Sequence, residues 1–144
     1  IIQNNLEIDG MKTLDLFGGT GCISYELASR GAQELTIVEK DPKMAEFIKS
    51  TAATLGFGNI KLVKQDVFAY MSQCTEQYDF IFAGPPYALT TIDELPLLLF
   101  RQKLLKPGGW FVLEHTPRND YRKFDNYIAE RNYGTTIFSF FVQS

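Results

Sequence analysis

The chain has 144 residues, 45% of them hydrophobic and 22% charged, which suits one compact domain and leaves no room for a second full one. This balance excludes a disordered or collagen-like protein. Apolar runs such as 97–100 are far too short to span a membrane. A formal charge of −3 argues against a protein that holds nucleic acid through a broad basic surface.

The two cysteines and the single histidine are too few and too scattered for a recognisable zinc site. Cys22 and Cys74 stand outside any CxxC pattern, and we expect both to be buried packing thiols. His115 has no evident partner in the sequence, which favours a local structural role. The chain begins at Ile1 without an initiating Met or a signal-peptide pattern, so we expect a fragment start and a cytoplasmic protein.

Short apolar strands alternate with amphipathic helices up to about residue 114, the pattern of a parallel sheet covered by helices on both faces. In chain order, the sequence predicts a strand at 13–17, a helix ending at Gly31, a strand at 34–39, a helix from Asp41 to Gly56, a strand at 60–64, a helix at 67–74, a strand at 78–83, a helix at 93–103 and a strand at 110–114. The last helix is expected to end before the proline- and glycine-rich stretch 106–109.

The second helix is the best defined, because Asp41 can cap it, Pro42 suits its first turn and Gly56 can end it. Apolar residues at helical spacing mark the face of each helix that should meet the core. These residues are Met44, Phe47, Ile48, Ala52 and Leu55 in the second helix, Ile23, Leu27 and Ala28 in the first, and Val67, Tyr70, Met71 and Cys74 in the third.

After residue 114 the alternation stops. The stretch 124–142 is rich in aromatic and aliphatic residues around Gly134, which predicts an antiparallel hairpin that closes the sheet edge. Its first arm could instead be helical. The sequence therefore predicts an α/β protein with a doubly wound, mostly parallel sheet and an antiparallel C-terminal hairpin, with residues 1–144 forming a single domain.

A glycine-rich turn connects the first strand to the first helix. It consists of Phe17, Gly18, Gly19, Thr20 and Gly21. Such a turn lets the backbone approach a ligand and exposes helix N-terminal amide groups. A nicotinamide dinucleotide is one candidate, because residues 19–24 nearly fit GxGxxG, although the third glycine is missing. Asp15 precedes the turn, where a dinucleotide-binding strand is usually apolar, and its carboxylate can order the loop or meet a ligand amine through water.

Acidic residues also follow the second and third strands. Glu39 can accept hydrogen bonds from both hydroxyl groups of a ribose, or it can be a solvated strand-end acid. Asp66 can accept a hydrogen bond from an adenine amino group and can also cap the next helix. Because parallel strands bring their carboxyl ends to one edge, Asp15, Glu39 and Asp66 are expected to converge where open α/β sheets bind ligands.

The fourth strand is followed by Gly84, Pro85, Pro86 and Tyr87. Two consecutive prolines and an aromatic ring form a stiff ledge with a flat apolar surface. The Pro85 carbonyl can accept a hydrogen bond from a planar exocyclic amine while Tyr87 stacks on the base that carries it. The ledge therefore suits an amino group on an aromatic ring, whereas the structural alternative is a plain proline turn.

In this order the runs LDLFGGTG, VEKD, KQDVF, FAGPPY and LKPGGWFVLEH resemble the class I S-adenosylmethionine-dependent methyltransferases. Within that class the chain is most similar to the bacterial 16S ribosomal RNA guanine-N2 methyltransferases, the RsmD-like family. The resemblance covers nearly the whole chain and implies a Rossmann-like methyltransferase sheet. It implies that the 17–21 loop, with Asp15 nearby, surrounds the methionine part of the cofactor, that Glu39 holds the ribose and Asp66 the adenine, and that the ledge holds the target base. Their neighbours Lys40 and Val67 complete the implied cofactor site.

The chain departs from the family pattern in two places. The family has Asp or Asn directly before the two prolines, where this chain has Gly84, and that side chain would accept a hydrogen bond from the target amine. Family members also carry an N-terminal arm that contributes to RNA contact and precedes the part of the chain seen here. The best remaining candidates for phosphate contact are Arg118, Arg122 and Lys123.

The resemblance implies transfer of a methyl group from S-adenosylmethionine to the N2 amine of a guanine in 16S ribosomal RNA, leaving S-adenosylhomocysteine. The expected partner is ribosomal RNA or the small ribosomal subunit particle, with no membrane, metal or cysteine nucleophile involved. Transfer would be direct, with the base turned out of its stack. The alternatives are a methyltransferase acting on another amine in DNA, protein or a small molecule, a cofactor-binding domain with catalysis impaired at Gly84, and a nicotinamide-dependent oxidoreductase.

Overall fold

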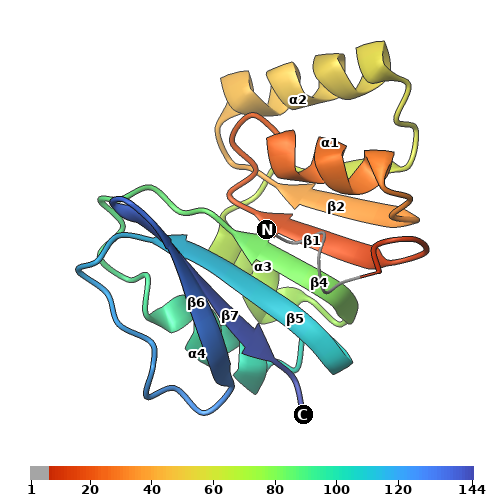
Figure 1. The fold of residues 1–144 in the computed structure, drawn as a ribbon. Coiled ribbons are helices and arrows are strands. Elements are labelled where there is room, and N and C mark those ends of the chain that lie inside the picture. The colour runs from red at the N-terminus through yellow and green to blue at the C-terminus, as the bar shows by residue number, and fades with distance from the viewer. Residues whose placement is uncertain (1–6) are drawn as a thin grey trace.

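A computed structural model describes residues 7–144, in which strands and helices alternate as the sequence predicts (Figure 1). The strands are β1 (Lys12–Leu16), β2 (Glu34–Val38), β3 (Ile60–Val63), β4 (Tyr78–Ala83), β5 (Leu105–His115), β6 (Tyr127–Tyr133) and β7 (Thr136–Val142). The helices are α1 (Cys22–Ser29), α2 (Pro42–Leu55), α3 (Val67–Gln73) and α4 (Glu94–Arg101). The expected fragment start at Ile1 lies outside the described residues. No helix within 7–144 is long and apolar enough to cross a membrane.

All seven strands belong to one sheet with the order β3-β2-β1-β4-β5-β7-β6. The strands β1 to β5 pair in parallel, whereas β7 runs antiparallel to both β5 and β6. The predicted fold class and the C-terminal hairpin are therefore confirmed, and the first arm of the hairpin is a strand and not a helix. The strand order reverses between β1 and β4, and such a reversal marks the usual ligand-binding edge of an open α/β sheet.

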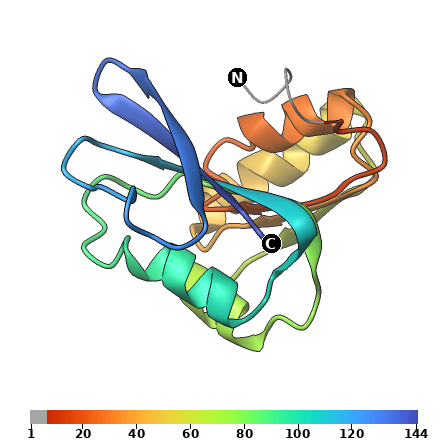
Figure 2. The same ribbon diagram turned by 60° about the horizontal axis from the view of Figure 1, so that its bottom comes forward.

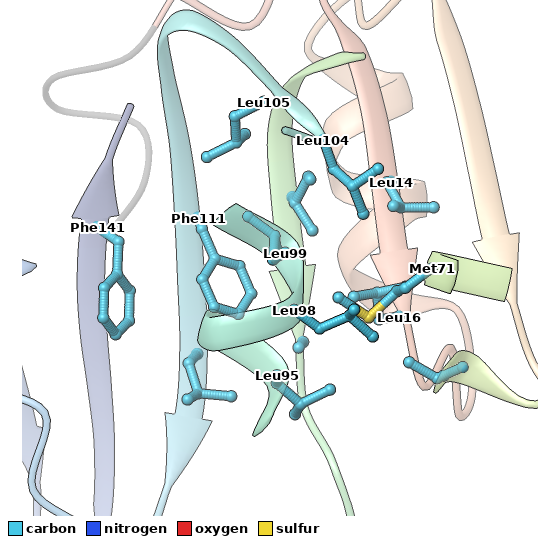
Figure 3. Close-up of a cluster of buried hydrophobic side chains, with 14 of the residues drawn as sticks. Leu14, Leu16, Met71, Leu95, Leu98, Leu99, Leu104, Leu105, Phe111 and Phe141 are labelled. Carbon is cyan, nitrogen blue, oxygen red and sulfur yellow. The ribbon is translucent and has the colours of Figure 1, made fainter. Parts of the chain in front are cut away.

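Helices cover both faces of the sheet, with α1 and α2 on one side and α3 and α4 on the other (Figure 2). The larger buried cluster lies under α3 and α4, and Figure 3 shows its central side chains, which include Leu14, Leu16, Met71, Leu95, Leu98, Leu99, Phe111 and Phe141. The smaller cluster lies under α1 and contains Leu27, Leu35, Phe80, Phe82 and Val112. Successive strand residues point to opposite faces, so Asp15, between Leu14 and Leu16, lies on the α1 side.

The ends of α2 form as the local sequence predicts. Asp41 caps the helix by accepting a hydrogen bond from the Lys43 amide at 2.9 Å, and Gly56 ends it with a φ of +78°. Its inward stripe is narrower than predicted: Ala45, Ile48 and Ala52 are buried and Met44 is half-buried. Phe47 and Leu55 are each 51% exposed, because Phe47 lies beside that stripe and Leu55 lies in the last turn.

Several other expectations about burial and boundaries are wrong. Cys22 is exposed at the first position of α1, and Cys74 is only half-buried at the end of α3. In α1, Ser24 takes a buried position while Ile23 and Ala28 are half-buried. The strand expected at 110–114 starts earlier because Leu105 pairs with Tyr78 on β4, and Gly108 and Gly109 pair with Gln143 through two backbone hydrogen bonds, of 2.8 and 3.0 Å.

Candidate active site

The predicted acidic residues and the ledge gather at the edge where β1, β2, β3 and β4 end. Two cavities lie along this edge, with volumes of about 310 Å³ and about 200 Å³. Phe17, Gly19 and Gly84 line both, so the two cavities adjoin. The larger volume falls within the range of small-molecule sites, roughly 300–1,000 Å³.

Asp15 is a buried carboxyl group at the end of β1 and lines the smaller cavity. Ser24, in the first turn of α1, donates a hydrogen bond of 3.0 Å to Asp15 Oδ2. Burial raises the pKa of Asp15 from its ordinary value of 3.8 to about 8; the Ser24 bond opposes this shift and the Glu39 charge adds to it. At neutral pH the side chain is therefore largely protonated, and a cation placed beside it would favour the carboxylate, with the proton released to solvent.

The glycine loop is held tightly against β2. The Gly18 amide donates to the Val38 carbonyl at 3.1 Å, and a Cβ on Gly18 would collide with the Ile37 side chain. Phe17 has a φ of +61°, which a residue with a large side chain rarely adopts. Strained backbone of this kind often marks a ligand site. The predicted turn is thus confirmed in shape, while its ligand stays a prediction.

Glu39 connects the glycine loop to the start of α2. Its Oε1 accepts a hydrogen bond of 2.8 Å from the Gly19 amide, and its Oε2 accepts one of 3.0 Å from the Asp41 amide. A carboxylate has about four lone-pair sites, so both oxygens can accept a further bond. Glu39 lines the larger cavity, which makes it more than a solvated strand-end acid.

The segment that follows β3 also lines the larger cavity. Asp66 Oδ2 caps α3 by accepting a 3.1 Å hydrogen bond from the Ala69 amide, which confirms the predicted capping role. Its adenine-binding role stays a prediction. Lys40 and Val67 also line the cavity, as predicted. Its wall includes four residues that the sequence analysis did not single out: Val38, Gln65, Phe68 and Leu89.

The ledge after β4, residues 84–87, contributes to two different cavities. Gly84 and Pro86 line the larger cavity, while Pro85 is buried. Tyr87 is 63% exposed and lines a further cavity of about 330 Å³ together with Ala88, Thr116 and Arg118. An exposed ring next to a cavity is available for stacking.

Glu114, near the end of β5, is a site residue that the sequence analysis missed. It is half-buried and lines the smaller cavity with Asp15 and Gly84. Burial raises the pKa of its carboxyl group. A charged residue near the end of an otherwise apolar strand is the same signal that identified Asp15, and it could have identified Glu114.

The other polar residues near this edge have local roles. His115 is buried, with Nδ1 2.8 Å from the Thr116 carbonyl oxygen and Nε2 2.7 Å from Ser139 Oγ, as expected of a structural histidine. Arg122 is engaged by Asp120 through two side-chain hydrogen bonds, of 2.9 and 2.7 Å. Residues 7–144 contain no group of three His, Cys, Asp or Glu side chains that could hold a metal ion.

Comparison with known proteins gives matches over most of the chain. Residues 1–142 match the family described as Conserved hypothetical protein 95. The "Ribosomal RNA small subunit methyltransferase D" of Buchnera aphidicola subsp. Baizongia pistaciae is 27% identical over 111 residues, which cover 77% of this chain and 57% of the relative. This chain thus spans little more than half of that relative's length.

Solved structures share the fold. A conserved hypothetical protein from Streptococcus pyogenes has a TM-score of 0.86 and 26% identity, covering 94% of this chain and 88% of its own. SMU.776, solved in complex with SAH, has a TM-score of 0.75 and 20% identity, covering 96% of this chain and 47% of its own. The resemblance drawn from the motifs is thereby confirmed, and the chain belongs to the Conserved hypothetical protein 95 family.

Proposed function

We propose that this chain binds S-adenosylmethionine and transfers its methyl group to the exocyclic N2 amine of a guanine in 16S ribosomal RNA. The observation that carries the proposal is the pair of adjoining cavities. One has acidic side chains at two strand ends and the other has two acidic side chains beside the ledge. The name of the Buchnera relative supports ribosomal RNA as the substrate class, and such a substrate fits the cytoplasm.

The larger cavity fits an adenosine group. Apolar side chains from Val38, Val67 and Leu89 offer faces for a flat ring, and Asp66 stands where a ring amine can be recognised. Glu39, which lines the same cavity, can accept a hydrogen bond from each hydroxyl of a ribose diol while it holds the Gly19 amide. The complex of SMU.776 with SAH supports this assignment because that protein shares the fold.

The smaller cavity fits the amino-acid part of the same cofactor. Asp15 lies at its base, and the loop from Phe17 to Thr20 forms one side. An ammonium group beside Asp15 would lower the pKa of that carboxyl group, so that its proton is released to water. When bound, the cofactor supplies an electrophilic methyl group on a sulfonium centre.

The residues of this chain then have to present an amine to that methyl group. Pro85 and Pro86 fix the backbone where β4 ends, and Tyr87 offers a ring on which a base can stack. Holding the base in line with the reacting carbon contributes to catalysis through proximity and orientation, and the reaction needs no covalent enzyme intermediate. Arg118, exposed in the cavity beside Tyr87, can contact a flanking phosphate.

Gly84 supports a second candidate function, a cofactor-binding domain with impaired catalysis, because no side chain at this position can accept a bond from the amine. Calorimetry and methyl transfer separate the two. Tight binding of S-adenosylmethionine with transfer to RNA supports the enzyme, whereas binding with no transfer until Gly84→Asp is introduced supports the impaired domain.

The direct experiment offers labelled S-adenosylmethionine with one of three acceptors: ribosomal RNA that lacks the modification, DNA, or a peptide. We expect label in the RNA alone. Label in DNA or peptide would instead assign another amine substrate. Tighter binding of NAD than of S-adenosylhomocysteine would contradict the proposal at its first step and favour an oxidoreductase.

A further inference from the structure

Gly84 has no side chain, and the carboxylate of Glu114, on the neighbouring strand β5, faces the space beside it. Ala83 pairs with Leu113 across β4 and β5, so Gly84 and Glu114 occupy the next register position. Glu114 Oε1 lies 3.3 Å from the position that a Cβ on Gly84 would take. A side chain on residue 84 and the Glu114 carboxylate would therefore share one small space.

Glu114 points to the same side of the sheet as Asp15. Leu113 belongs to the cluster under α3 and α4, and strand residues alternate, so Glu114 faces the α1 side. The Phe82 ring lies on this side too, 3.1 Å from the Cβ position of Gly84. The Glu114 carboxylate is thus backed by an apolar ring and opens into the smaller cavity.

The Glu114 carboxylate is not used by the fold. Within residues 7–144, burial alone raises its pKa, with no hydrogen bond or opposite charge acting on it. By contrast, Asp15 is hydrogen-bonded to Ser24. His115, which follows Glu114 in the chain, is hydrogen-bonded to Ser139 on β7. A half-buried carboxylate without a protein partner keeps its lone pairs available to a ligand.

We propose that Glu114 accepts a hydrogen bond, and then the proton, from the amine that is methylated. This inference rests on the proposed function. The amine nitrogen uses its lone pair to form the bond to the methyl carbon, and the electrons of the broken carbon–sulfur bond return to sulfur, which becomes a neutral thioether. The nitrogen, now positively charged, passes one proton to the Glu114 carboxylate, which later releases it to water.

The test replaces Glu114 with Gln, which keeps the shape of the side chain and removes the charge. We expect kcat for RNA methylation to fall by about 10²–10⁴-fold, the usual contribution of a positioned acid or base. The KM for S-adenosylmethionine and the affinity for S-adenosylhomocysteine should stay near wild type. The control is Glu46→Gln, at an exposed position on α2, which should leave all three values unchanged.

A second variant tests the role through the neighbouring position. Gly84 has no positive φ, so Asp can be placed there without backbone strain. The double variant Glu114→Gln/Gly84→Asp should have a kcat at least tenfold higher than that of Glu114→Gln alone, because Gly84→Asp returns a carboxylate to the same space. As a single substitution, with Glu114 present, Gly84→Asp should reduce kcat, because two carboxylates then compete for one proton and one space.

A readout without turnover separates this inference from the proposed function. Guanosine binding to protein loaded with S-adenosylhomocysteine should be weakened about tenfold by Glu114→Gln, the loss of a charge-assisted hydrogen bond. If the wild type fails to methylate ribosomal RNA but shows this difference, the substrate is wrong and the role of Glu114 stands. Equal guanosine affinity of the two proteins would overturn the inference, as would a loss confined to S-adenosylhomocysteine affinity.

Discussion

Asp15→Asn removes a buried ionisable group and should change how stability depends on pH. Asp15 is 3% exposed and burial raises its pKa to about 8, against 3.8 for an unburied aspartate. Between these two pH values the folded protein holds a proton that the unfolded chain has released. Stability therefore falls as pH rises through this window, by about 1.4 kcal/mol per pH unit.

From about pH 5 to about pH 7, Asp15 alone should lower the free energy of unfolding of the wild type by about 3 kcal/mol. Asp15→Asn lacks this contribution, and Ser24 can still donate its hydrogen bond to the amide oxygen. Urea unfolding at the two pH values measures the difference. Asp125→Asn, at an exposed position, should keep the wild-type dependence. An equal loss of stability in the wild type and Asp15→Asn would refute the assignment of a protonated, buried Asp15.

Three further predictions concern the cofactor and the ledge. Binding of S-adenosylhomocysteine near pH 7 should release about one proton from Asp15, which calorimetry in buffers of different ionisation enthalpy detects; no release would contradict an ammonium site there. Glu39→Gln should weaken S-adenosylhomocysteine binding about tenfold by removing a charge-assisted bond to the ribose, and unchanged affinity would exclude that role. Tyr87→Ala should raise KM for RNA about tenfold through lost stacking with little change in melting temperature, whereas Tyr133→Ala, at another exposed tyrosine, should leave KM unchanged.

The parts of the fold that depend on local chemistry could be predicted from the sequence. The ends of α2 follow from Asp41 and Gly56, because a cap and a left-handed glycine act within a few residues. Strand ends that carry acidic residues in a parallel sheet meet by topology, which explains why Asp15, Glu39 and Asp66 reach one edge.

The parts that depend on pairing between distant segments could not be predicted. The early start of β5 at Leu105 arises from pairing with Tyr78 on β4 and from hydrogen bonds of Gly108 and Gly109 to Gln143, some 35 residues later in the chain. The exposure of Phe47 depends on how α2 is rotated against the sheet. The approach of Glu114 to Gly84 depends on the register of β5 against β4, so the sequence reveals a gap at position 84 but not the carboxylate beside it.

The central claim is tested most directly by identifying the methylated nucleoside. Hypomethylated 16S ribosomal RNA, free or in the small-subunit particle, is incubated with the protein and S-adenosylmethionine carrying a deuterated methyl group, then digested and analysed by mass spectrometry. We predict label in N2-methylguanosine, with strong loss of label for Glu114→Gln. Label in any other nucleoside, or no label from a protein that binds S-adenosylhomocysteine, would contradict the account.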